Sequence, residues 1–171
     1  MDGVLCDSQA SVELVWRGWG DQHGIAWERI QPAIHGRRTE DAVHHFAPSL
    51  DARSEAATMA SAEMMFAAQT KALPGAPELI TSHPKYRWAV VTSASRLLAL
   101  ERLIAAGLDR PSELVCSGDV DHGKPAPDCY ALAAEHLKVS PTRCVVFEDV
   151  LLGFRSACAA KTRVVALTTS H

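Results

Sequence analysis

The sequence predicts an α/β fold in which a parallel β-sheet carries helices on both faces. Two patterns in the 171-residue chain lead to this prediction. Residues from about 8 to 71 have a helical character, whereas short apolar runs alternate with helix-like segments after residue 73. Such alternation of strands and helices is typical of a parallel sheet with helices on both faces. The length allows one well-buried core with a smaller appended module.

The helical character of residues 8–71 rests on the spacing of apolar side chains and on composition. Apolar residues recur every three or four positions at Val12, Val15, Trp16 and Trp19, and again at Ala42, Val43 and Phe46. This spacing places them on one face of a helix. Residues 56–68 are rich in Ala, Met and Glu, which favour helices. We expect the methionines of this region to be packing residues: Met59, Met64 and Met65.

The pattern changes at Leu73-Pro74-Gly75. Four apolar runs then predict strands over residues 88–92, 113–116, 144–147 and 163–167. Helix-like segments lie between them, at about 96–106, 126–138 and 152–160. The last of these is followed by Lys161-Thr162 rather than by glycine, which predicts a helix end strained by about 1 kcal/mol. In parallel sheets the ligand lies at the carboxyl ends of the strands, so chemistry is expected directly after these runs.

Polar residues stand at four such places. They are Asp2-Gly3, Thr92-Ser93, Gly123-Lys124-Pro125 and Glu148-Asp149. Each has an ordinary alternative explanation: a turn, a helix N-cap, a bend before a helix, or acidic residues that favour a helix N-terminus. Together they supply what phosphoryl transfer needs. Carboxylates hold a hard divalent cation, a lysine and a hydroxyl bind phosphate oxygens, and a further carboxylic acid protonates the leaving alkoxide.

Three local strings carry a resemblance to a known family. They read Asp2-Gly-Val-Leu-Cys-Asp-Ser8, Gly123-Lys-Pro-Ala-Pro-Asp128 and Val145-Val-Phe-Glu-Asp149. In this order they resemble the motifs of the haloacid dehalogenase superfamily. The resemblance implies a Rossmann-like core, formed by residues 1–10 and 73–171, whose first strand is largely missing. It also implies a helical cap, residues 11–72, inserted after the first motif.

The resemblance also implies a role for each motif. Asp2 corresponds to the catalytic general acid/base, and its main-chain carbonyl corresponds to a metal ligand. The phosphate-binding hydroxyl corresponds to Thr92 or Ser93, with Ser93 preferred. The lysine that takes part in catalysis and binds phosphate corresponds to Lys124. The acidic pair that holds the cofactor Mg²⁺ corresponds to Glu148 and Asp149.

The nucleophile of this family is an Asp two positions before the acid/base residue. Met1 matches the variable position between the two, so the nucleophile lies outside the 171 residues. Either the chain is a fragment of a longer reading frame, or it is a non-catalytic relative that binds or regulates. We expect the first, because the remaining motifs are complete. The 171-residue chain by itself is expected to hydrolyse no phosphate ester, to bind Mg²⁺ poorly and to leave apolar strand edges open.

The string Ile34-His-Gly-Arg-Arg-Thr-Glu-Asp-Ala-Val43 resembles the cap of phosphatases that act on glycerol phosphate, deoxyglucose phosphate and related sugar phosphates. We expect four cap residues to face a small anionic sugar or polyol phosphate: His35, Gly36, Arg37 and Arg38. The ordinary alternative is a loop in which Gly36 turns, Thr39 caps the next helix and the arginines are solvated. A β-phosphoglucomutase-like phosphomutase is a rival activity, but Val12 stands where such enzymes carry a histidine.

Composition argues against other classes of partner. A net charge of −3 gives no reason to expect nucleic acid or an anionic membrane as a partner. No apolar run is long enough to span a bilayer. The five cysteines show no C-x-x-C spacing, which favours free thiols in a reducing compartment. We therefore expect a cytoplasmic monomer whose partner is a small phosphorylated metabolite.

Overall fold

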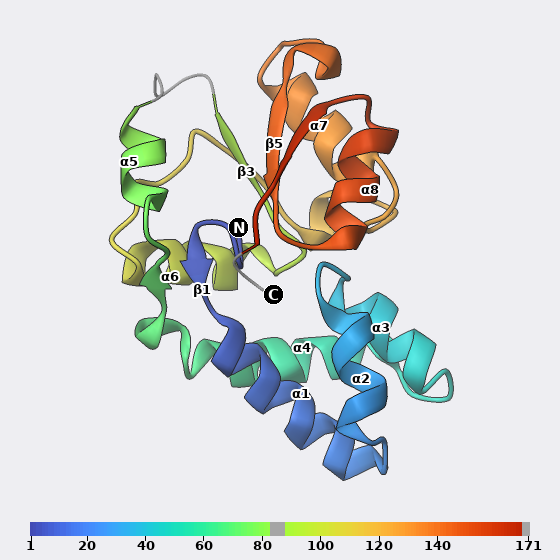
Figure 1. The fold of residues 1–171 in the computed structure, drawn as a ribbon. Helices are drawn as coiled ribbons and strands as arrows, with labels where there is room; N and C mark the ends of the chain where they lie inside the picture. The colour runs from blue at the N-terminus through green and yellow to red at the C-terminus, as the bar shows by residue number, and fades with distance from the viewer. Residues whose placement is uncertain (83–87, 169–171) are drawn as a thin grey trace.

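The computed structural model describes residues 1–82 and 88–168. Its first large unit is helical (Figure 1) and consists of α1 Gln9–His23, α2 Trp27–Ile34, α3 Thr39–Phe46 and α4 Ala52–Met64. The four helices share an apolar core that includes Trp16, Trp19, Ile30, Val43 and Met59. The predicted helical character is confirmed, because the spacing of the two tryptophans places both rings on the buried face of α1.

Two details of this helical unit differ from the expectations. Met59 is buried, but Met65 is 79% exposed, because α4 ends at Met64 and the following residue turns toward solvent. Thr39 does not cap α3. It is the first residue of that helix, and the capping position belongs to Arg38, whose side chain makes no capping hydrogen bond.

The rest of the described chain forms two pairs of parallel strands surrounded by helices (Figure 1). β3 Ala89–Val91 pairs with β4 Glu113–Val115, and β5 Val145–Glu148 pairs with β6 Arg163–Ala166. The helices are α5 Ala76–Thr81, α6 Arg96–Ala105, α7 Asp128–His136 and α8 Leu151–Ala159. Short elements complete this part: antiparallel β1 Cys6–Asp7 and β2 Lys71–Ala72, and the 3-10 turns Ala67–Gln69, Ser117–Asp119 and Pro141–Arg143. No described helix is both long and apolar enough to cross a membrane.

Helices cover both faces of the β3–β4 pair because successive strand residues point to opposite sides. Val90 and Leu114 pack with residues of α5 and α6 in one core cluster. Val91 and Val115 pack with residues of α7 and α8 in another. The predicted α/β class is therefore confirmed, and all four predicted strands form at the expected places.

A cavity of about 630 Å³, here called the interstrand cavity, lies between β3 and β5. Its walls are mainly apolar and include Val90, Val146 and Phe147. In the described part of the chain, β3 pairs with no strand except β4, and β5 with none except β6. Each pair therefore presents an inner edge to the cavity that no other described strand pairs with. Met1 lies at one end, where its amino group donates to the carbonyl oxygen of Val91 at 3.3 Å.

Each of the helices α6, α7 and α8 is followed by a residue in the left-handed region. These residues are Gly107, Lys138 and Lys161, with φ angles of 67°, 55° and 61°. After α8 the main-chain N–H of Lys161 donates to the carbonyl of Cys158 at 2.9 Å, which closes the turn as a glycine would. A lysine side chain is strained in this conformation. The strained helix end predicted at Lys161 is confirmed, whereas the one at Lys138 was not foreseen.

Candidate active site

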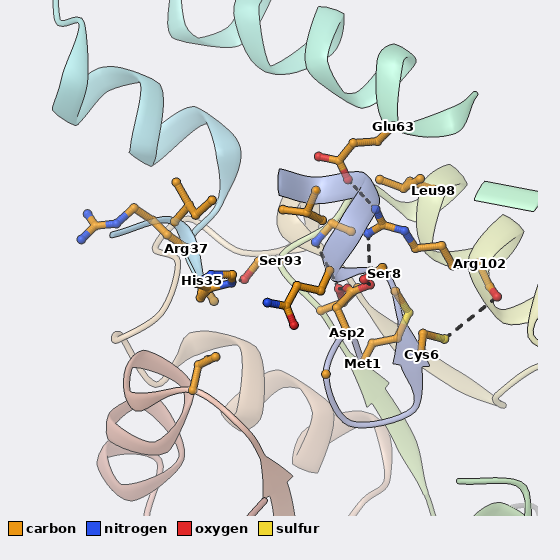
Figure 2. A pocket seen from close by; sticks show the side chains of 18 of the residues that line it. Met1, Asp2, Cys6, Ser8, His35, Arg37, Glu63, Ser93, Leu98 and Arg102 are labelled. Atoms are coloured by element: carbon orange, nitrogen blue, oxygen red, sulfur yellow. Dashed lines mark hydrogen bonds and ion pairs between the residues drawn. The ribbon is translucent and has the colours of Figure 1, made fainter. Parts of the chain in front are cut away.

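A smaller cavity, of about 160 Å³ and here called the site cavity, opens beside the carboxyl ends of β3 and β5 (Figure 2). The N-terminal turn, the loop after α2 and residues of α1, α4 and α6 also line it. Nine of the residues proposed from the sequence line it: Asp2, His35, Gly36, Arg37, Thr92, Ser93, Lys124, Glu148 and Asp149. These residues come from five separate parts of the chain, and the strand-end rule accounts for most of them.

The carboxylate of Asp2 is held from three sides. Its Oδ1 accepts hydrogen bonds from Ser8 Oγ at 2.7 Å and from Arg102 Nη1 at 3.0 Å. Its Oδ2 accepts a longer one from Thr92 Oγ1 at 3.3 Å. Burial raises the pKa of Asp2, but the Arg102 guanidinium, the amino terminus and the two hydroxyls outweigh it, so the pKa lies below its usual value. Asp2 is therefore an ionised carboxylate of fixed orientation.

The two hydroxyls that follow β3 have different partners. Thr92 Oγ1 contacts Asp2 and also accepts the main-chain N–H of Ala94 at 3.1 Å. Ser93 Oγ donates to the main-chain oxygen of Gly36 at 2.9 Å, so it joins the end of β3 to the loop after α2. Neither residue caps α6, because Ser95 holds the capping position. The ordinary alternative for this motif, a helix N-cap, is therefore wrong.

Lys124 and Glu148 form a buried ion pair on the opposite wall. Lys124 Nζ and the hydroxyl of Tyr130 both donate to Glu148 Oε1. The other carboxylate oxygen, Oε2, accepts the main-chain N–H of Asp149 at 3.2 Å. Burial raises the pKa of Glu148, but the Lys124 ammonium and these donors outweigh it and lower the pKa. The lysine thus reaches the cavity with its charge held by a carboxylate.

The fit of a divalent cation to these residues is incomplete. Across residues 1–82 and 88–168, no three Asp, Glu, His or Cys side chains gather in an arrangement that could hold a metal ion. The Glu148 carboxylate is engaged by Lys124 and Tyr130. Asp2 and Asp149 line the cavity, but Mg²⁺ requires near-octahedral oxygen coordination. The described residues therefore supply only part of a magnesium site.

Arg38, expected to face a substrate, does not line the cavity. Its guanidinium forms two hydrogen bonds with the carboxylate of Asp41, at 2.7 and 2.8 Å, and a third with the carbonyl of Val120 at 3.0 Å. The loop that carries Gly123 lies against this pair so closely that a β-carbon there would overlap both side chains. Arg38 therefore links the start of α3 to the main chain at Val120 and does not face the cavity.

The site cavity is also lined by polar residues that were not among the sequence-based candidates, including Ser8, Glu63 and Arg102. Arg102 bridges Asp2 and Glu63. Burial raises the pKa of Glu63, and the Arg102 guanidinium offsets only part of that effect. One signal in the sequence could have revealed Arg102, because helical spacing places this charge on the apolar face of α6 with Leu98 and Leu103.

Comparisons with known proteins define the class of this site. The sequence model of the haloacid dehalogenase-like hydrolase family matches residues 1–160. Hexitol phosphatase A of Escherichia coli (strain K12) is 38% identical over 98% of this chain and 80% of its own length. Glycerol-1-phosphate phosphohydrolase 2 of Saccharomyces cerevisiae is 31% identical over 99% of this chain and 73% of its own length. The protein belongs to the haloacid dehalogenase-like hydrolase family.

Solved structures agree with this assignment. The crystal structure of a hydrolase from Pseudomonas syringae superimposes with a TM-score of 0.86 at 28% identity, over 98% of this chain and 81% of the other. That of CbbY from Rhodobacter sphaeroides, in complex with phosphate, has a TM-score of 0.83 at 22% identity, covers 97% of this chain and 82% of the other, and supports the fold alone. The fold and family expected from the sequence are thus confirmed.

Proposed function

We propose that this protein, when the chain carries an aspartate directly before Met1, hydrolyses a small sugar or polyol phosphate monoester. The observation that carries the proposal is the site cavity, in which a fixed carboxylate, a buried lysine and polar cap residues meet. The relatives support the substrate class, because their names include phosphatases of hexitol phosphate, glycerol-1-phosphate and 2-deoxyglucose-6-phosphate. A cavity of about 160 Å³ suits a small substrate.

In the first step, the carboxylate before Met1 attacks phosphorus and the bond to the leaving sugar or polyol oxygen breaks, which leaves an aspartyl-phosphate. Asp2 donates a proton to the departing oxygen. The negative charge of a bound phosphate favours protonation of Asp2, because a nearby like charge raises the pKa of a carboxyl group. In the second step, Asp2 takes a proton from water. The resulting hydroxide attacks phosphorus, releases inorganic phosphate and regenerates the first carboxylate.

The other cavity residues bind and orient the substrate. Lys124 and Ser93, with Thr92 as the second hydroxyl, hold phosphoryl oxygens. His35 and Arg37, which line the cap side of the cavity, contact the sugar or polyol. Gly36 keeps the cap loop close to the core, since a β-carbon there would overlap Val150.

Magnesium dependence belongs to the same proposal. A carboxylate before Met1 would add one oxygen donor to those that Asp149, Glu148 and the main-chain carbonyl of Asp2 would supply to the cation, which would stabilise negative charge on the phosphate. We therefore expect Mg²⁺ binding to require the extended chain.

The five cysteines are all free, in line with a reducing compartment, and we propose a cytoplasmic monomer with no nucleic-acid or membrane partner.

The test compares three proteins: the 171-residue chain, the chain extended by an apolar strand that ends in Phe-Asp before Met1, and the same extension ending in Phe-Asn. Each is assayed for phosphate release from hexitol, glycerol and 2-deoxyglucose phosphates with Mg²⁺. We expect turnover only with the Phe-Asp extension, and loss of that turnover with a chelator. Absence of turnover across the panel by this extended chain would contradict the phosphatase proposal and favour a binding protein. Conversion of one sugar phosphate into its isomer without phosphate release would indicate a phosphomutase.

A further inference from the structure

Arg102 is a buried cation that touches both the core and the cap beside the site cavity (Figure 2). Its side chain is only 2% exposed. One nitrogen, Nη1, donates to Asp2 Oδ1 at 3.0 Å, and the other, Nη2, donates to Glu63 Oε2 at 2.6 Å. Asp2 belongs to the N-terminal turn, Glu63 to the last turn of α4 and Arg102 to α6. One guanidinium therefore links three separate parts of the chain.

The geometry of this bridge fixes which oxygen of Asp2 is engaged. Arg102 and Ser8 both donate to Oδ1, whereas Oδ2 accepts the longer, 3.3 Å bond from Thr92. The side chain of Asp2 is 31% exposed, while that of Glu63 is 8% exposed. The more weakly held oxygen of Asp2 is thus the one left to exchange a proton with a ligand.

The guanidinium of Arg102 is a planar fork, and two carboxylates, those of Asp2 and Glu63, align it. A planar fork transmits orientation, because fixing one nitrogen in the plane fixes the other. Burial of the whole group makes this alignment dependent on both partners. Among the described residues, the third guanidinium nitrogen of Arg102, Nε, has no hydrogen-bond partner. Only the two carboxylates therefore orient the group.

We propose that Arg102 is a positioning residue for Asp2. It fixes Oδ1 and directs Oδ2 toward the leaving oxygen of the substrate, and Glu63 of the cap sets the orientation of the guanidinium. The inference rests on the proposed function, in which Asp2 transfers the proton. It also gives the cap a part in catalysis besides covering the substrate, since α4 must lie in place for Arg102 to be aligned.

The test uses the dependence of the rate on the leaving group. An alkoxide leaving group needs protonation, whereas p-nitrophenolate leaves without it. In the chain extended by Phe-Asp, we expect Arg102→Met to lower kcat about 100-fold with glycerol phosphate, the size expected for a misaligned acid. The comparison is made on the first turnover, in which the aspartyl-phosphate forms, because both esters share the second step, in which Asp2 takes a proton from water. With p-nitrophenyl phosphate the loss in this first step is expected to stay below about 10-fold, and KM to change little with either ester. Arg102→Lys, which keeps the charge without the planar fork, should show an intermediate loss with the same contrast.

Controls separate positioning from general damage to the fold. Arg96→Met, at an exposed salt bridge on the same helix, should leave kcat for both esters unchanged. Glu63→Met should lower kcat with glycerol phosphate about 10-fold and leave p-nitrophenyl phosphate almost unaffected.

Equal losses with both esters in the Arg102 variants would overturn the positioning role, and unchanged kinetics of Glu63→Met would overturn the part assigned to the cap. If the unsubstituted extended chain hydrolyses neither ester, the proposed function itself fails and the positioning role falls with it.

Discussion

The α-carbon of Gly153 faces the carboxylate of Glu148 so closely that a methyl group at residue 153 would overlap it. The Glu148 carboxylate is buried with Lys124 and Tyr130 and has little freedom to move. We expect Gly153→Ala to lower the free energy of unfolding by about 2 kcal/mol, as overpacked cores do. Urea unfolding measures the change. Gly18→Ala is the matched control on α1, where a β-carbon meets nothing within 4 Å, and it should raise stability by about 0.5–1 kcal/mol. If both substitutions changed the free energy of unfolding equally, overlap with the Glu148 carboxylate could not explain the effect of Gly153→Ala.

The buried pair of Lys124 and Glu148 predicts strong coupling between the two positions. Removing one partner leaves a buried charge unpaired, so Lys124→Met should destabilise the chain by about 3–5 kcal/mol. Adding Glu148→Gln removes that charge, and the double variant should be more stable than Lys124→Met alone. A double-mutant cycle of urea unfolding at pH 7 measures the coupling. Additive effects would show that the pair contributes no coupling energy in solution.

The carboxylate of Asp119 predicts a dependence of stability on pH. It accepts the N–H of Cys116 at 2.8 Å and Arg96 Nη2 at 2.6 Å. Burial raises the pKa of Asp119, but the bonds from Arg96 and Cys116 outweigh it and lower the pKa. A lowered pKa stabilises the fold above the unfolded value, about 3.9, and this contribution is lost as pH falls through the folded value.

We therefore expect Asp119→Asn to lower Tm at pH 7 and to have a much smaller effect at about pH 2, where the carboxyl group is protonated in the folded chain as well. Asp109→Asn, at an exposed position, is the control. An Asp119→Asn effect of the same size at both pH values would exclude the ionised carboxylate as its cause.

The left-handed residue after α8 predicts a stabilising substitution. The strain of about 1–2 kcal/mol on a side chain in this region exceeds the entropy that glycine loses on folding, about 0.4–1 kcal/mol. Lys161→Gly should therefore raise stability by about 0.5 kcal/mol, and Lys138→Gly should act in the same direction. Gly107→Ala, after α6, should lower it. Thermal unfolding of the three variants checks the signs, and a loss of stability in Lys161→Gly would refute the argument.

The sequence predicted the strands well because each is a short apolar run, although only β3 and β4 among them contain fully buried apolar side chains. Val90 and Val146 stand in apolar runs bounded by polar residues, and such runs locate a strand without knowledge of its neighbours. The parallel order then brought Thr92, Lys124 and Glu148 to one edge, as the strand-end rule requires. Local pattern and topology together therefore placed most of the candidate site.

The sequence could not place contacts that depend on how helices α1 to α4 meet the rest of the chain. Arg37 and Arg38 are adjacent basic residues of one loop, yet only Arg37 lines the cavity, because Asp41 and the carbonyl of Val120 hold the other. The bridge between Glu63 and Arg102 joins residues 39 positions apart. No spacing rule pairs two such residues, and only the packing of α4 against α6 brings them together.

The interstrand cavity gives this chain a place where an added strand can pair. Its two inner strand edges offer main-chain donors and acceptors that only an extended backbone can pair with, and Met1 already bonds Val91 at one end. A separate apolar peptide that ends in aspartate has the chemistry to fill the gap and to bring a carboxylate beside Asp2. Under the proposed function, adding such a peptide would switch hydrolysis on, and phosphate release would then report binding of the peptide.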